Sequence, residues 1–279
     1  LPMVILNVQL GCPSTGLPTK TEQGDLLQAL YGRNGETPLP VLAASSPADC
    51  FDVAIESFRI AVSHMTPVFV MSEGYLATGA EPWQIPNIDD MEPIKIEHLT
   101  GVPNFEPYKR DEKTLARPWV IPGTPDMEHR IGGLEKEDRT GDVSYDPQNH
   151  EFMCRIRAEK TERVADFFPP VKIDGPDKGE LLVLSWGGSY GAVFSAVDLA
   201  QKAGKSVSHV HLRYINPFQK DLGDVLRGFN QVLIPEMNLG QLSFLIRAKY
   251  LVDAVSLSKV QGQPFTITEI ENKIEELLS

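Results

Sequence analysis

Apolar residues follow two periodicities in the N-terminal part of the chain. Short runs rich in valine and isoleucine occur at residues 3–8, 40–44 and 67–71, and they predict buried strands. Residues 22–31 and 50–64 instead predict helices, the second from its apolar side chains at helical spacing. Because strand and helix alternate, this part predicts a parallel sheet with helices on both faces.

A second α/β unit is predicted from residue 180 onward. Residues 181–186 form an apolar run that predicts a buried strand, and a glycine-rich turn at 187–191 leads into a helix at 192–203. Further strands are predicted at 209–212, 231–234 and 265–267. The fold class is therefore α/β.

The segment between these units differs from both in composition, because it is rich in proline. Prolines interrupt every regular pattern, at positions 82, 86, 93, 103, 107, 118, 122 and 125. We expect a long, ordered connection that packs on a neighbour and ends in a helix at 151–167. The predicted divisions are 1–100, a Pro-rich connecting segment 101–170, and 171–279.

Charge and cysteine content narrow the possible functions. The net charge of −12 argues against a nucleic-acid surface. The three cysteines form no C-x-x-C pair, so this chain alone builds neither a zinc site nor an iron–sulfur cluster, and we expect a cytoplasmic setting. No apolar run approaches a membrane span, so no membrane contact is expected. The chain opens on Leu1-Pro2 directly before a strand, which leads us to expect the C-terminal portion of a longer protein.

The turn after the first strand is the main candidate for chemistry. It reads Gly11-Cys12-Pro13-Ser14-Thr15-Gly16-Leu17-Pro18-Thr19-Lys20. Ligands bind at the carboxyl ends of strands in open α/β sheets, and hydroxyls and amides of such a loop suit an anionic group. By spacing alone, a plain strand-to-helix turn is the better explanation of the run. The predicted substrate-binding residues are Leu10, Gly11, Cys12, Pro13, Ser14 and Thr15.

This loop resembles the signature of the α subunit of 2-oxoacid:ferredoxin oxidoreductases, and it is most similar to the 2-oxoglutarate enzymes. Segments 129–138, 145–150, 213–218 and 234–242 extend the resemblance over the whole chain. It implies a partial thiamine-diphosphate, pyrimidine-type domain at 1–100, followed by a transketolase C-terminal-like domain at 171–279.

The resemblance also implies a function. Members of the family oxidatively decarboxylate a 2-oxoacid onto coenzyme A and pass the electrons to ferredoxin. Thiamine diphosphate supplies the carbanion chemistry. A partner β subunit holds the diphosphate through Mg²⁺ and carries an iron–sulfur cluster. The glutamate that activates the cofactor would precede Leu1, so we expect the isolated chain to be inactive and assign it no catalytic or metal-binding residue.

One position departs from the family. Members carry an arginine immediately before the glycine, where the guanidinium clamps the substrate carboxylate, but this chain has Leu10. Altered substrate binding, a degenerate copy and a sequence error each account for the change. The alternative function is a non-catalytic assembly subunit. A transketolase-type enzyme acting on sugars is a third hypothesis, which the loop sequence argues against.

The remaining polar residues favour structural roles. We expect the glycines at 187–191 to permit a close strand–helix crossing, and Glu236 to be a cap or interface residue. Glu73 also follows a strand and is a weak catalytic candidate. His209 and His211 alternate on one strand and lack a third metal ligand. The cysteines are expected to be buried, with Cys12 alone a candidate reactive thiol.

Overall fold

The apolar runs of the N-terminal part form one sheet. The computed structural model describes residues 1–279, and this sheet has the order β1-β3-β2-β7. Three strands are parallel: β1 (Met3–Gln9), β2 (Val41–Ala43) and β3 (Pro67–Glu73). The fourth, β7 (Tyr214–Asn216), comes from the C-terminal part and pairs antiparallel with β2. The two parts of the chain are therefore joined through a shared sheet.

The helices of this part cover the sheet through their apolar faces. The helices are α1 (Leu26–Tyr31), α2 (Asp49–His64) and α3 (Gly74–Thr78). In α2, Val53, Ile60 and Ala61 are buried and pack in one apolar cluster with Val68 and Val70 of β3. Ser46 Oγ accepts a hydrogen bond from the Asp49 amide, which satisfies one free donor at the start of α2. The strand β1 lies at the edge and leaves Met3 and Leu6 exposed.

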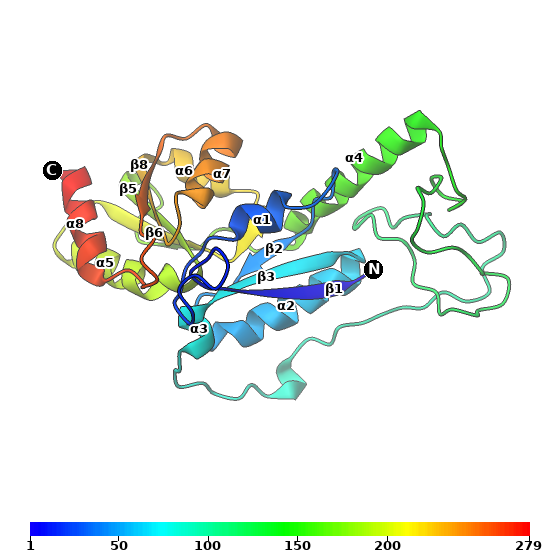
Figure 1. The fold of residues 1–279 in the computed structure, drawn as a ribbon, viewed down its shortest axis with the longest axis horizontal. Helices are drawn as coiled ribbons and strands as arrows, with labels where there is room; N and C mark the ends of the chain where they lie inside the picture. Colours follow the sequence, from blue (N-terminus) through cyan, green and yellow to red (C-terminus); the bar gives the residue numbers. More distant parts are fainter.

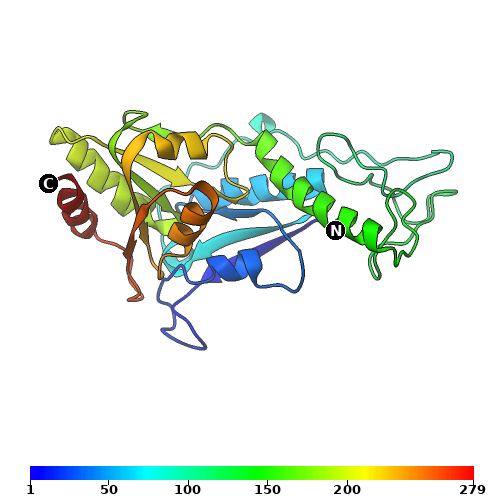
Figure 2. The same cartoon turned by 90° about the horizontal axis from the view of Figure 1, so that it is seen from above.

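The second sheet lies beside the first and has helices on both faces (Figures 1 and 2). Its order is β4-β6-β5-β8-β9, and all strands except β4 are parallel. The strands are β4 (Ile173–Asp174), β5 (Gly179–Trp186), β6 (Val207–Leu212), β8 (Phe229–Glu236) and β9 (Ala254–Ser258). Helices α5 (Tyr190–Lys202) and α8 (Ile267–Leu278) pack in one apolar cluster, and α6 (Leu222–Arg227) and α7 (Gln241–Tyr250) in another.

The core continues from one sheet to the other. Leu26 and Ala29 of α1 belong to the same buried cluster as Leu184 and Trp186 of β5. Burial of these side chains removes apolar surface from water at both sheets at once, which stabilises their mutual arrangement.

The Pro-rich segment extends away from the sheets, past the far end of α4 (Figure 1). Apart from a 3₁₀ turn at Ile88–Asp90, residues 79–146 form no helix or strand. The segment returns through α4 (Pro147–Arg163) and a 3₁₀ turn (Val164–Phe167). Trp119 anchors it to α2 because its indole N–H donates to the Val62 carbonyl over 3.3 Å. Packing of this segment on a neighbour stays a prediction, as do the division points at 100 and 170.

Three predicted elements differ in the structure. The first helix begins at Leu26 instead of residue 22, because the preceding residues form tertiary hydrogen bonds described below. The strand predicted at 265–267 is wrong, since Thr266 is the N-cap of α8. The helix predicted at 151–167 begins earlier, at Pro147, because the Asp146 carboxylate accepts from the Asn149 amide over 2.7 Å. None of the helices combines the length and apolar composition of a membrane-spanning helix.

Candidate functional site

The loop after β1 is closed by its own backbone. The Gly11 amide donates to the Lys20 carbonyl over 2.9 Å, and the Leu17 amide donates to the Gly11 carbonyl over 2.8 Å. Gly16 has a φ of +41°, and a β-carbon there would stand 1.8 Å from the Gly11 carbonyl oxygen. The tight approach therefore requires glycine at this position.

The structure brings all six predicted substrate-binding residues together at the carboxyl end of β1. Gly11 is buried, and the residues from Cys12 to Thr15 are exposed at the tip of the loop. Ser14 has a positive φ of 59°, and the Cys12–Pro13 peptide bond is cis. The substrate-binding role of these residues stays a prediction.

Leu10 lies at the base of the loop and contacts the start of α3. A β-carbon built on Gly74 would stand 2.9 Å from Leu10 Cδ2, so the leucine packs against this glycine. The leucine side chain offers no donor to an anion. Lys20, the one cation of the loop, was not among the predicted site residues. Its side chain is exposed, and its backbone closes the loop, which places an ammonium group within the same element.

The segment after the loop joins the two sheets. The Gln23 side chain donates to the Trp186 carbonyl over 3.0 Å and accepts from the Met237 amide over 3.0 Å. Its backbone amide donates to the Met237 carbonyl over 2.9 Å, and its carbonyl accepts from the Asn238 side chain over 2.8 Å. Gln23 is fully buried. One residue therefore fixes the candidate loop relative to the ends of β5 and β8, and only its tertiary partners reveal this.

Glu73 ends β3 within this same junction. Its carboxylate accepts from the Gly188 amide over 2.8 Å, and a β-carbon on Gly188 would stand 2.1 Å from that oxygen. Burial raises the pKa of Glu73 to about 8, while the hydrogen bonds from Gly188 and Gln23 lower it in part. At neutral pH the carboxyl group is therefore mostly protonated. The Gly187-Gly188 turn lets this carboxyl group approach the backbone, which explains the glycines without a phosphate.

Glu236 has the structural role predicted for it. Its carboxylate accepts from the Leu242 and Ser243 amides over 2.7 and 2.9 Å. These are free donors at the start of α7. Burial raises the pKa of Glu236, and the hydrogen bonds from Ser243 and Leu242 oppose that shift.

The two histidines of β6 share a hydroxyl group. Ser185 Oγ lies 2.7 Å from His209 Nε2 and 2.8 Å from His211 Nδ1. Burial lowers the pKa of His209 to about 4 and that of His211 well below its usual value, so both rings are neutral at pH 7. Ser185 is completely buried. Asp174 Oδ2 lies 3.7 Å from His209 Nδ1, but no group of three His, Cys, Asp or Glu side chains could hold a metal ion.

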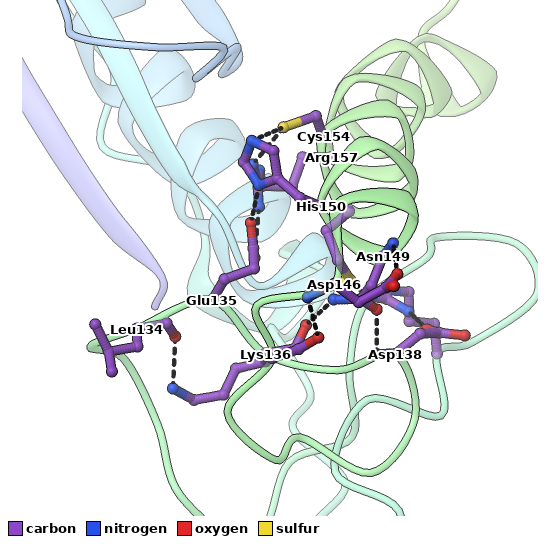
Figure 3. Close-up of polar contacts among 12 residues, drawn as sticks. Leu134, Glu135, Lys136, Asp138, Asp146, Asn149, His150, Cys154 and Arg157 are labelled. Atoms are coloured by element: carbon purple, nitrogen blue, oxygen red, sulfur yellow. Dashed lines mark hydrogen bonds and ion pairs between the residues drawn. The ribbon is translucent and has the colours of Figure 1, made fainter.

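The three cysteines lie in different environments. All three are free, Cys12 is exposed on the loop, and burial raises the pKa of the Cys50 thiol, with the nearby Asp49 carboxylate adding to the shift. Cys154 is half-buried in a polar cluster on α4, so the prediction that it is buried is wrong (Figure 3). Its sulfur accepts from Arg157 Nη2 over 3.1 Å and lies 3.7 Å from His150 Nε2.

Comparison with known proteins matches this architecture to one family. Residues 1–146 match the family model described as pyruvate flavodoxin/ferredoxin oxidoreductase, thiamine diphosphate-binding. The chain is 51% identical over 280 residues to 2-oxoglutarate oxidoreductase subunit KorA of Mycobacterium tuberculosis, covering all of this chain and 43% of that protein. It is 32% identical over 245 residues to 2-oxoglutarate synthase subunit KorA of Archaeoglobus fulgidus, covering 86% and 62%.

A solved structure supports the same relationship in three dimensions. The 2-oxoglutarate:ferredoxin oxidoreductase of Magnetococcus marinus, with 2-oxoglutarate, coenzyme A and succinyl-CoA bound, superposes with a TM-score of 0.92 at 31% identity. The match covers all of this chain and 49% of that one. The chain therefore spans about half the length of such relatives, and the α/β fold class predicted from its sequence is confirmed.

Proposed function

Because the chain belongs to the thiamine-diphosphate-binding family of pyruvate flavodoxin/ferredoxin oxidoreductases, we propose that it forms part of the α subunit of a 2-oxoacid:ferredoxin oxidoreductase. We propose 2-oxoglutarate as its substrate, with an acyl-CoA as product and ferredoxin as electron acceptor. The observation that supports this most directly is the closed loop from Leu10 to Lys20. It stands at the carboxyl end of a parallel strand and is fixed between two sheets by Gln23.

The loop supplies two kinds of anion contact in this proposal. The exposed hydroxyls of Ser14 and Thr15 donate to one carboxylate of the substrate. Lys20 provides the only positive charge of the loop itself, because Leu10 offers none. Since 2-oxoglutarate carries two carboxylates, Lys20 pairs with the second, and partner subunits complete the remaining contacts.

The residues around the loop fit a thiamine cofactor that is shared with another part of the complex. Thr21 Oγ1 is buried beside the loop without a hydrogen-bond partner, and such a group is costly unless a ligand satisfies it. When bound, thiamine diphosphate supplies the carbanion chemistry, and Thr21 would orient one polar group of it. We place Mg²⁺ and the iron–sulfur cluster on a β subunit, as the resemblance to the family implies.

Exposed apolar side chains agree with a hetero-oligomer. Met3 and Leu6 are exposed along the edge strand β1, and Ile85, Ile88 and Tyr145 are exposed between α3 and α4. Such surfaces are expected to be covered by partner subunits. No observation in the structure favours the non-catalytic alternative or a sugar-processing enzyme.

The test is an assay of the complex reconstituted from its complete subunits. We expect coenzyme A-dependent reduction of a viologen dye with 2-oxoglutarate, weaker activity with pyruvate and none with sugar phosphates. The chain 1–279 alone should show no activity. Turnover of sugar phosphates, or of 2-oxoglutarate by the isolated chain, would contradict the proposal.

A further inference from the structure

The turn between β9 and α8 lies against the candidate loop. This turn covers residues 259–264 of the second α/β unit. Within it, Gly262 is buried, and a β-carbon built on this glycine would stand 2.9 Å from Lys20 Cβ and 3.4 Å from Lys20 Cγ. The aliphatic stem of Lys20 therefore packs directly on the backbone of the turn, although the two residues are far apart in sequence.

Lys259 holds the two ends of this turn together. Its side chain is buried, and its ammonium donates to the Pro264 carbonyl over 3.0 Å and to the two carboxylate oxygens of Glu269 over 2.8 and 2.9 Å. Its backbone amide donates to the Glu236 carbonyl over 3.0 Å. Because all three donors of the ammonium have acceptors, the turn is fixed both to the end of β8 and to the start of α8.

The hydrogen bonds of the loop fix the backbone of Lys20 but not its side chain. The Lys20 amide donates to the Leu17 carbonyl over 3.1 Å, and the Lys20 carbonyl accepts from the Gly11 amide over 2.9 Å. These bonds determine where the side chain begins. A lysine stem has four carbons and is flexible, so its direction depends on what it packs against. Gly262 supplies such a contact and restricts the stem before any ligand binds, which lowers the entropy cost of binding.

We propose that the turn 259–264 positions the ammonium of Lys20 for one carboxylate of a dicarboxylate substrate. The inference rests on the proposed function, in which Lys20 pairs with the second carboxylate of 2-oxoglutarate. It assigns a part in substrate selection to the second α/β unit, through two positioning residues, Gly262 and Lys259, that do not themselves contact the substrate. A side chain at position 262 would occupy the place of the Lys20 stem, and loss of the Lys259 ammonium would release the ends of the turn.

The test is substrate selectivity, measured on the reconstituted complex as kcat/KM for 2-oxoglutarate divided by kcat/KM for pyruvate. Lys20→Met should lower this ratio at least about tenfold, because only the dicarboxylate loses a charge-assisted contact. Gly262→Ala and Lys259→Met should lower it about threefold or more, as partial loss of the same contact predicts. The change should lie in the KM for 2-oxoglutarate. Both substrates are assayed on one preparation, so incomplete folding of a variant leaves the ratio unaffected.

Two variants of the same unit serve as controls. Gly204→Ala changes a glycine with a positive φ of 82° that has open space around it, and Lys205→Met removes the lysine that pairs with Glu275. Both should leave the ratio unchanged. The double variant Lys20→Met/Gly262→Ala should show no lower ratio than Lys20→Met alone, because the turn acts through Lys20. A merely structural role of the turn would instead lower the activity with both substrates in parallel.

Hydrogen exchange of the loop gives a readout that is independent of turnover. Peptides spanning Gly11 to Lys20 should exchange faster in Gly262→Ala than in Gly204→Ala, because displacement of Lys20 loosens the hydrogen bonds that close the loop. Equal exchange in these two variants, an unchanged ratio in both turn variants, or a further fall of the ratio in the double variant would overturn the inference alone. Absence of any 2-oxoacid turnover by the unaltered complex would contradict the proposed function, and the inference with it.

Discussion

At the scale of single residues, the candidate site depends on positions whose neighbours change their chemistry. Leu10 packs on Gly74 and offers no charge, and burial keeps Glu73 mostly protonated at neutral pH although the Gly188 amide donates to it. Gln23 looks like an ordinary polar residue before a helix, yet it makes hydrogen bonds to Trp186 at the end of β5 and to Met237 directly after β8. The residue types predicted the position of the loop. The protonation of Glu73 and the anchoring of the loop by Gln23 depend on contacts that only the structure shows.

Substitution of Leu10 tests the carboxylate-binding role of the loop. We expect Leu10→Arg in the reconstituted complex to lower the KM for 2-oxoglutarate at least about tenfold, because a charged bidentate donor adds about 1.5–3 kcal/mol to anion binding. The control Leu17→Arg places the same charge on an exposed position of the same loop and should leave KM unchanged. An unchanged KM for Leu10→Arg in steady-state kinetics would refute the assignment of this position.

At the scale of elements, local sequence patterns predicted most strands and helices correctly, but one predicted strand is wrong. The strands at 3–9, 41–43 and 67–73 follow from their apolar runs, and α2 follows from its helical spacing. Thr266 and Glu269 form a capping box that converts a predicted strand into the start of α8. The capping box can be read from the local sequence, but the apolar residues around it favoured the prediction of a strand.

The geometry of the loop is tested by Gly16→Ala. The added methyl group would meet the Gly11 carbonyl at 1.8 Å, so the loop must open. We expect turnover to fall at least about tenfold, since small misplacements of substrate contacts have such effects. The control Gly35→Ala has a similar positive φ of 71° but open space around it, and it should retain full activity. Equal activity of the two variants would show that closure of the loop is not required.

The capping box gives a separate prediction for stability. Thr266→Ala removes the side chain that accepts from the Glu269 amide, so unfolding free energy should fall by about 1 kcal/mol. Urea unfolding followed by circular dichroism measures this change. Thr268→Ala, at an exposed position of the same helix, is the control and should change stability by less than about 0.5 kcal/mol.

At the scale of the whole molecule, two sheets share one core and one polar junction. β7 leaves the C-terminal part to pair with β2, and α1 packs against the second sheet. The carboxyl ends of β3, β5 and β8 meet where Glu73, Gly188 and Met237 lie. Stability of the junction is therefore expected to depend on the protonation of Glu73.

This dependence has a definite sign. The pKa of Glu73 is about 8 in the folded protein against 4.5 for the ordinary side chain, so the folded state favours the protonated form. Its contribution to stability is complete below pH 4.5 and is lost as pH rises through 8. Glu73→Gln is neutral at every pH and should remove this loss. Urea unfolding at several pH values measures the difference, with the exposed Glu36→Gln as control. A parallel pH dependence in the Glu73→Gln variant and the unaltered protein would contradict the raised pKa.

The sequence by itself determined the α/β class, most strands, the position of the candidate loop and the resemblance to its family. These features depend on local periodicity and on short motifs, which act between residues that are close along the chain. The tertiary structure decided that β7 crosses to the other sheet, that Gln23 and Glu73 form the junction, and that the turn 259–264 lies against Lys20. Burial and proximity set these properties, and both arise only when residues distant in sequence meet.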